Sequence, residues 1–206
     1  AGLTVMAVHN HYPQAAVMTG LPDESFIRAD IPMTKREIRA SVVSRLSPAK
    51  DAIVYDIGAG TGSVSVELAM HALYGTVYAV ERTKEGCELI AQNARKFGLD
   101  NIDIINASAA DVIEKLPAAD SVFIGGSGGE LEKIMDIVLK KNPGVHIVIT
   151  AVTLETLNDS VRLMEDKKVD VIDIVQIAVT QIKKRGRYHM LAANNPVFII
   201  EGRGNR

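Results

Sequence analysis

The sequence contains one cysteine, Cys87, among 206 residues. A single thiol excludes an intrachain disulfide and any zinc site built from several cysteines. Nowhere do eighteen consecutive apolar residues occur, and the first twenty residues lack a basic segment followed by a sustained apolar run. We therefore expect a cytoplasmic protein that is neither exported nor embedded in a membrane.

The sequence also has no large excess of positive or negative charge. The chain has 23 Lys and Arg against 25 Asp and Glu, a net charge of -2. This balance provides no overall basic field, so nucleic acid is not indicated as a partner. Hydrophobic residues make up 47% of the sequence, and no low-complexity run interrupts them. We expect one globular domain over residues 20–206, preceded by a weakly ordered arm over residues 1–19.

The chain does show a regular alternation of strand and helix patterns. Apolar, β-branched runs occur at 53–57, 76–80, 102–105, 122–124, 145–152, 169–180 and 197–200. Segments with the 3.6-residue period of a helix lie between the first five of these runs. The alternation predicts an α/β fold of the Rossmann-like class, with a seven-stranded, mostly parallel sheet and helices on both faces.

Two further patterns concern the ends of this fold. Thr34 to Glu37 forms a capping box, which predicts a helix with Thr34 at its N-cap before the first strand. Residues 181–195 show no helical pattern and include a basic run, Lys183 to Arg187. A long hairpin-like excursion is predicted there, which makes the last two sheet strands antiparallel.

The most informative motif is the glycine-rich turn after the first strand. Glycines allow positive φ and a close approach of the backbone to a ligand. A dinucleotide-binding turn requires glycine three residues after Gly60, where this chain has Ser63. The acidic Asp56 would repel a pyrophosphate but suits the ammonium group of S-adenosylmethionine. The residues of this turn that are predicted to contact S-adenosylmethionine, the methyl donor, are Asp56, Gly58, Ala59, Gly60, Thr61 and Gly62.

Polar residues follow the next two strands at the same sheet edge. Glu81 ends the second strand, where a carboxylate can accept hydrogen bonds from both ribose hydroxyls. Ser108 and Ala109 follow the third strand and are expected near the adenine. The sequence therefore predicts a nucleoside site across the carboxyl ends of the first three strands.

Additional motifs extend this pattern: Ile31 to Lys35 (IPMTK), Gly125 to Glu130 (GGSGGE) and Ala151 to Glu155 (AVTLE). Over roughly residues 20–202 the chain resembles the decarboxylating cobalt-precorrin-6B (carbon-15) methyltransferase family of cobalamin biosynthesis, which also forms the C-terminal half of precorrin-6Y methylase. Many of these relatives have an acidic residue where this chain has Ser108.

The resemblance implies an S-adenosylmethionine-dependent methylation of a corrin precursor. The substrate would be precorrin-6B or its cobalt form, methylated at carbon 15 with loss of carbon dioxide from the carbon-12 acetate, which gives precorrin-7 or its cobalt form. S-adenosylhomocysteine would be the second product. The resemblance also implies a donor contact at Thr34 and assembly into homotetramers.

The substrate site is predicted from the loop after the fourth strand. Its small residues leave room for a flat tetrapyrrole, and the predicted contacts are Gly125, Gly126, Ser127, Gly128 and Gly129. Arg185 and Arg187 are expected to pair with the carboxylates of the substrate. Positioning can lower the barrier more than a general base does, so no catalytic base or metal is required. Catalytic residues stay unassigned; the candidates are Glu130, Tyr188 and His189.

Three alternatives are left open by the sequence. An RNA methyltransferase would use the same donor and a basic groove, and would bind heparin or tRNA in moderate salt. A protein isoaspartyl methyltransferase would need a site for a peptide carboxylate. A non-catalytic NAD-binding module would be stabilised by NAD and not by S-adenosylhomocysteine.

Overall fold

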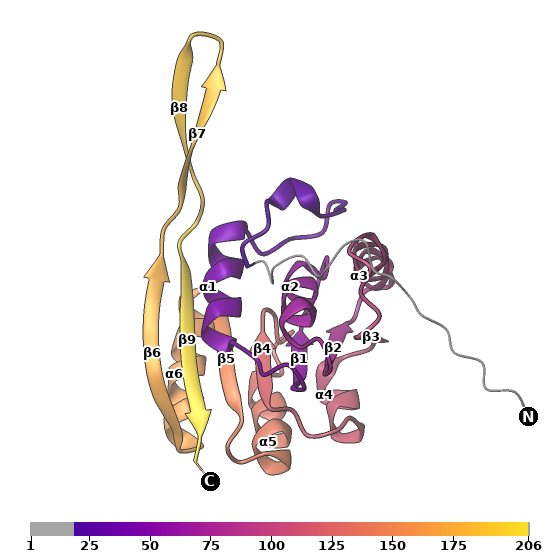
Figure 1. Ribbon diagram of the computed structural model, residues 1–206. Coiled ribbons are helices and arrows are strands. Elements are labelled where there is room, and N and C mark those ends of the chain that lie inside the picture. Colours follow the sequence, from indigo (N-terminus) through magenta and orange to yellow (C-terminus); the bar gives the residue numbers. More distant parts are fainter. Residues whose placement is uncertain (1–18, 206) are drawn as a thin grey trace, which may run out of the picture.

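The computed structural model describes residues 19–205, so the arm expected over residues 1–19 lies, apart from Thr19, outside the described residues. A seven-stranded sheet with the order β3-β2-β1-β4-β5-β9-β6 forms the centre of the molecule (Figure 1). Its strands are β1 (Ile53–Ile57), β2 (Thr76–Glu81), β3 (Ile102–Asn106), β4 (Ser121–Ile124), β5 (His146–Ala151), β6 (Val169–Ile177) and β9 (Val197–Gly204). Strands β1 to β5 pair in parallel, and β9 is antiparallel to both β5 and β6. The predicted α/β fold is confirmed.

Helices cover both faces of the sheet, as predicted (Figure 1). One face carries α1 (Arg36–Leu46), α2 (Ser63–His71) and α3 (Lys84–Lys96), and the other carries α4 (Ala109–Val112), α5 (Leu131–Lys141) and α6 (Leu154–Asp166). Two short 3-10 helices are also present, η1 (Asp23–Ser25) and η2 (Ile113–Lys115). None of the helices within residues 19–205 combines the length and the apolar character needed to cross a lipid bilayer.

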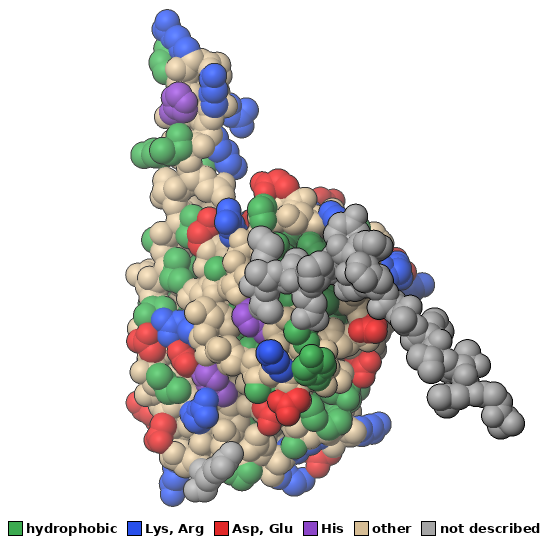
Figure 2. Space-filling model, in the orientation of Figure 1, with side chains coloured by type: hydrophobic (Ala, Val, Ile, Leu, Met, Phe, Trp, Pro, Cys, Tyr) green, Lys and Arg blue, Asp and Glu red, His purple; other side chains and the backbone are tan. Residues whose placement is uncertain are grey.

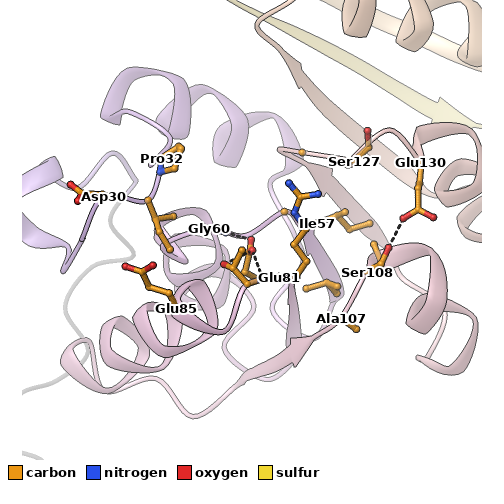
Figure 3. A pocket seen from close by; sticks show the side chains of 18 residues that line it. Asp30, Pro32, Ile57, Gly60, Glu81, Glu85, Ala107, Ser108, Ser127 and Glu130 are labelled. Atoms are coloured by element: carbon orange, nitrogen blue, oxygen red, sulfur yellow. Dashed lines mark hydrogen bonds between the residues drawn. The ribbon is translucent and has the colours of Figure 1, made fainter.

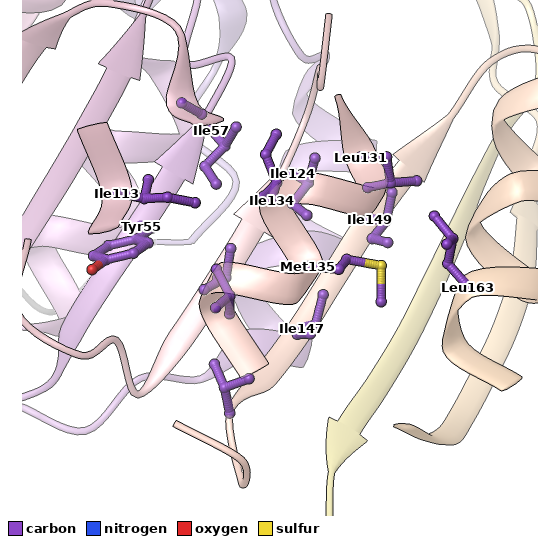
Figure 4. Packing of buried hydrophobic residues seen from close by; sticks show 14 of the residues in the cluster. Tyr55, Ile57, Ile113, Ile124, Leu131, Ile134, Met135, Ile147, Ile149 and Leu163 are labelled. Carbon is purple, nitrogen blue, oxygen red and sulfur yellow. The ribbon is translucent and has the colours of Figure 1, made fainter. Parts of the chain in front are cut away.

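The core has two layers because successive strand residues point to opposite faces of the sheet. On β1, Val54 packs in the cluster that contains residues of α1 and α2. Tyr55 and Ile57 belong to the cluster on the other face, where Ile134 and Met135 of α5 meet the sheet (Figure 4). Both layers are closed to solvent, so the sheet is a rigid support for the loops at its edges.

The start of α1 differs from the prediction. The helix begins at Arg36 with Lys35 as its N-cap, and no side chain in the described part of the chain caps it. The Thr34 carbonyl accepts a hydrogen bond from Arg39 Nη1 at 2.6 Å. This contact holds Thr34 outside the helix, so the predicted Thr34 capping box is wrong.

The long strand predicted over residues 169–180 ends earlier, at Ile177, as β6. It is followed by a separate two-stranded hairpin that consists of β7 (Thr180–Arg185) and β8 (Tyr188–Ala193). The hairpin leaves the sheet after Ile177, the last residue of β6, and projects away from the body of the molecule (Figure 1). Its side chains include a concentration of lysine and arginine near the tip (Figure 2). The predicted hairpin-like excursion and the antiparallel pairing of the last two sheet strands are thus confirmed.

Candidate functional site

A cavity of about 510 Å³ opens at the carboxyl ends of the parallel strands (Figure 3). Its walls come from residues 30–32, the turn after β1, the end of β2, the start of α4 and the loop between β4 and α5. Parallel α/β sheets bind ligands at this edge, and the volume suits a nucleoside-sized ligand. The sequence prediction that these segments share one site is consistent with this arrangement.

The glycine turn after β1 forms the floor of the cavity. The amides of Gly58 and Ala59 donate to the Val80 carbonyl at 3.0 and 3.2 Å. Gly58 has a φ of +74°, and a Cβ added to it would lie 2.6 Å from the Gly126 carbonyl oxygen. Glycine is therefore required at position 58, both by backbone conformation and by contact with the facing loop.

Glu81 occupies the cavity wall at the end of β2, where the nucleoside prediction placed it. Gly60 N donates to its Oε2 at 3.0 Å, while the amide and hydroxyl of Thr83 both donate to Oε1 at 2.8 Å (Figure 3). A carboxylate offers roughly four acceptor positions. One remains on Oε2, so the fixed carboxylate can still accept a ligand hydroxyl.

Asp56 lies beneath this floor and does not line the cavity. Its side chain is fully buried, Ser65 Oγ donates to its Oδ2 at 2.5 Å, and its Oδ1 has no hydrogen-bond partner within residues 19–205. Burial raises the pKa of Asp56 to about 7. The expected direct contact with the donor's ammonium group is therefore corrected, because the side chain points into the protein interior.

The other predicted turn residues shape the floor without reaching the cavity. Ala59, Thr61 and Gly62 are absent from its described lining, whereas Gly58 and Gly60 are part of it. Thr34, which precedes α1 and is not part of this turn, is also absent from that lining. Thr61 is buried, and Gly62 precedes the first residue of α2 with a φ of +75°. These residues set the path of the chain from β1 into α2.

Ser108 and Ala109, at the start of α4, also line the cavity, at the end that Glu130 borders. Ser108 Oγ donates a hydrogen bond to Glu130 Oε2 (Figure 3). Glu130, a candidate catalytic residue in the sequence, thus contacts the end of the cavity predicted to hold the adenine.

The glycine loop between β4 and α5 separates two hollows. Gly126, Ser127 and Gly128 line the main cavity, and the whole loop from Gly125 to Gly129 also borders a second hollow of about 270 Å³. The far side of that hollow includes Ile149 and Val152. The predicted substrate loop therefore adjoins both the donor cavity and a separate, partly apolar space.

The basic residues expected to bind substrate lie elsewhere. Arg185, Arg187, Tyr188 and His189 are exposed near the tip of the β7–β8 hairpin, and none of them lines the cavity of its own chain. Arg187 instead donates to the Tyr188 hydroxyl at 2.7 Å. Arg185 and Arg187 stay predicted substrate contacts, and Tyr188 and His189 stay candidate catalytic residues, although the hairpin projects away from the cavity of its own chain (Figure 1).

Several cavity residues were missed in the sequence. Arg82, Thr83 and Glu85 directly follow β2, where the rule that identified Glu81 also applied. Ile31 and Pro32 were available in the IPMTK motif, from which only Thr34 was selected, and Asp30 directly precedes that motif. Arg82, Thr83 and Glu85 could have been predicted from their position at the end of a strand, whereas their residue types gave no indication.

The segment that carries Asp30 to Pro32 is fastened to the helices by a buried ion pair. Arg39 Nε donates to Glu67 Oε1 at 2.6 Å, and both side chains have no exposed surface. Glu67 also accepts from the amides of Gly20 and Leu21 at 2.8 and 3.0 Å, while Arg39 Nη2 donates to the Leu21 carbonyl. The upper wall of the cavity, formed by residues 30–32, therefore depends on the buried Arg39–Glu67 ion pair.

Comparisons with known proteins agree with this geometry. Residues 25–202 match the model of a family described as "Precorrin methyltransferase domain". A protein of Pyrobaculum calidifontis, "Probable cobalt-precorrin-6B C(15)-methyltransferase (decarboxylating)", is 40% identical over 184 residues, which cover 88% of this chain and 94% of the relative.

Two solved structures are similar in fold and sequence. "Precorrin-6y C5,15-methyltransferase" from Geobacter metallireducens has a TM-score of 0.83 and 38% identity, covering 91% of this chain and 96% of that one. "Precorrin 8W decarboxylase" from Methanobacterium thermoautotrophicum has a TM-score of 0.83 and 33% identity, covering 88% and 98%. The likeness extends over nearly the whole of each chain.

Proposed function

The chain belongs to the precorrin methyltransferase family, and from this premise we propose that it transfers a methyl group from S-adenosylmethionine to carbon 15 of precorrin-6B or its cobalt form. The carbon-12 acetate loses carbon dioxide, and precorrin-7 or cobalt-precorrin-7 and S-adenosylhomocysteine are the products. The observation that carries the proposal is the cavity in which Glu81, the Gly58 to Gly60 turn and the Gly126 to Gly128 loop meet.

The cavity has the polarity that this donor requires. Glu81 retains an acceptor position for a ribose hydroxyl, and the backbone floor carries no side chain that would obstruct the ligand. Carboxylates at Asp30, Glu81, Glu85 and Glu130 surround the cavity, with Arg82 as the one lysine or arginine in its described wall. Such a wall favours a cationic sulfonium ligand over a pyrophosphate.

Catalysis in this proposal depends on positioning. When bound, S-adenosylmethionine supplies an electrophilic methyl group. Glu81 and the glycine turn hold the nucleoside end, and the Gly126 to Gly128 loop leaves the methyl group accessible to a flat ring. Correct alignment of two reactants contributes about 7–11 kcal/mol, which exceeds the effect of a typical general base.

Decarboxylation breaks the bond between the acetate methylene and its carboxylate. Carbon dioxide leaves, the bonding electrons pass into the conjugated ring system, and a proton is taken up to give a methyl group at carbon 12. The partly apolar hollow behind the Gly125 to Gly129 loop, with Ile149 and Val152, has no lysine or arginine among its described lining residues. A carboxylate without an ion-pair partner loses carbon dioxide more readily, because a salt bridge stabilises the charged ground state.

The test follows both halves of the reaction at once. The protein is incubated with S-adenosylmethionine carrying a labelled methyl group and with precorrin-6B or cobalt-precorrin-6B in separate reactions. We expect methyl incorporation at carbon 15 together with release of one carbon dioxide. Methylation without gas release contradicts the decarboxylating half, and comparison of the two substrates identifies the preferred form.

Glu81→Gln tests the proposed role of Glu81 in binding S-adenosylmethionine, the methyl donor. The replacement keeps the size of the side chain but removes the charge that accepts from Gly60, Thr83 and the ribose. Hydrogen bonds to charged groups contribute about 1.5–3 kcal/mol, so the donor Kd should rise at least about tenfold. Unchanged donor affinity measured by calorimetry would remove Glu81 from the site.

We also propose that the protein forms homo-oligomers, in particular tetramers, through the β7–β8 hairpin. Ile182, Tyr188, Met190 and Leu191 are large apolar side chains exposed on this hairpin. Tyr188 and Met190 lie on one face of the hairpin, and the cross-strand partners Ile182 and Leu191 lie together on the other. An isolated hairpin is marginally stable in water, and a partner that covers this face would stabilise it.

A further inference from the structure

Ser108 and Glu130 form a polar pair at the end of the donor cavity. The two residues come from different elements, Ser108 from the N-cap of α4 and Glu130 from the residue before α5. Ser108 Oγ donates to Glu130 Oε2, and both side chains line the cavity (Figure 3). The pair therefore presents one combined surface to a ligand.

This surface consists of hydrogen-bond acceptors only. A serine hydroxyl has a single proton, and here that proton is directed to Glu130. The Ser108 oxygen keeps lone pairs, and the carboxylate of Glu130 keeps its Oε1 and a second position on Oε2. A ligand group that fits must therefore supply N–H or O–H donors, whereas a carbonyl oxygen would face acceptors without a proton between them.

We propose that the Ser108–Glu130 pair recognises the exocyclic amino group of the donor's purine and excludes a 6-oxo purine. The amino group has two N–H donors, which match the two acceptor side chains. The proposal rests on the proposed function in one respect, that the donor is S-adenosylmethionine. It makes Glu130 a residue that determines donor specificity, with no part in proton transfer to the corrin.

The surroundings of Glu130 are compatible with this assignment. Lys133 Nζ lies 3.9 Å from Glu130 Oε1 and 3.5 Å from Asp111 Oδ1, and more than half of the lysine side chain is exposed. An exposed pair at that distance is weak, so it does not remove the carboxylate as an acceptor. Ser108 itself cannot supply a carboxylate, and Glu130 delivers one from the neighbouring loop to the same point of the cavity.

The test measures binding and needs no corrin. Calorimetry gives the Kd of S-adenosylhomocysteine and of S-inosylhomocysteine, which differs in having a carbonyl oxygen at position 6. For the unmodified protein we expect a preference of at least about tenfold for the amino form, since a site that bonds N–H groups rejects an analogue lacking them. Glu130→Gln should reduce this preference strongly, because an amide can donate to the carbonyl.

Ser108→Ala and Glu132→Gln complete the set. Ser108→Ala removes one acceptor and should also narrow the ratio of the two Kd values. Glu132 is an exposed carboxylate on α5, outside the cavity lining, so Glu132→Gln should leave the ratio unchanged. A ratio that stays the same in Glu130→Gln overturns the proposal. Failure of the unmodified protein to bind S-adenosylhomocysteine overturns the donor assignment as well, and the two failures are thereby distinguished.

Discussion

Arg39 and Glu67 form an ion pair of 2.6 Å in which neither side chain has exposed surface. The pair joins α1 to α2, and through Glu67 it also holds the amides of Gly20 and Leu21. Arg39 additionally lies 4.5 Å from the ring centroid of Phe26. One buried pair thus connects the two helices with the chain segment that leads to the upper wall of the cavity.

Replacement of Arg39 by Met should destabilise the fold strongly. It leaves the Glu67 carboxylate buried without its cation, and breaking a buried pair in this way costs about 3–5 kcal/mol. Denaturant unfolding measures the loss. Arg162→Met is the control, because Arg162 pairs with Asp166 on the surface and such a pair contributes at most about 1 kcal/mol. Equal losses for the two variants would contradict the importance of burial.

Asp56 should make the stability depend on pH. Its pKa in the folded state is about 7 against an ordinary value of 3.8, because burial disfavours the charged form. Between these pH values the folded state binds more protons than the unfolded state, so this group lowers the free energy of unfolding as pH rises.

Asp56→Asn removes this contribution. The stability of the variant relative to the unmodified protein should therefore rise from about pH 4 to about pH 7 and then level off, by up to about 4 kcal/mol. Urea unfolding at a series of pH values gives the difference. Asp100→Asn, at an exposed position, serves as the control, and an equally flat difference for both variants would count against the shifted pKa.

Two glycines that face each other across the cavity floor should respond differently to substitution. Gly58→Ala places a Cβ 2.6 Å from the Gly126 carbonyl oxygen at a positive φ, so we expect a loss of about 2 kcal/mol or more. A Cβ at Gly126 would have no neighbour within 4 Å among the atoms of residues 19–205, so Gly126→Ala should change stability by less than about 0.5 kcal/mol.

Gly126→Ala should nevertheless weaken ligand binding, because its methyl group enters the cavity wall. Thermal unfolding with and without S-adenosylhomocysteine separates the two effects. If Gly58→Ala unfolds at the same temperature as the unmodified protein, the close approach of the two loops is not retained in solution.

A charge on the apolar face of the hairpin should disrupt assembly. Ile182→Glu and Leu191→Glu each place a carboxylate on the face shared by these cross-strand partners, so we expect a smaller particle by light scattering. The circular dichroism of the body should be unchanged, because the hairpin is a separate two-stranded sheet. Asn158→Glu adds the same charge at an exposed position of α6, outside the hairpin, and should keep the original mass. An unaltered mass in all three variants would exclude this face as the interface.

Most of the fold could be predicted from periodicity alone. The alternation of apolar runs identified the strands, and the absence of a helical pattern around Lys183 to Arg187 indicated the hairpin. The position of β9 between β5 and β6 could not be predicted, because partner choice depends on distant contacts. The start of α1 was missed for a related reason: a buried arginine, Arg39, binds the Thr34 carbonyl from one turn later.

The site was only partly predictable. The rule that ligands bind at the carboxyl ends of parallel strands located Glu81, Ser108 and the glycine loop. It failed for Asp56 because strand residues alternate between faces: Val54 lies on the side of α1 and α2, and Asp56, two residues later, is directed to the same side and is bonded by Ser65 of α2. The contact between Ser108 and Glu130 joins separate elements, and no local pattern in the sequence predicts it.

The floor of the cavity is held by main-chain hydrogen bonds on both sides. Gly58 N donates to Val80 O at 3.0 Å, and Gly125 N donates to Ile57 O at 2.9 Å, so the turn is bonded to the end of β2 and to the loop after β4. A backbone fixed in this way has little freedom to move when a ligand arrives. The shape of the floor is therefore set before a ligand binds, so that ordering this part of the backbone takes nothing away from the free energy of binding.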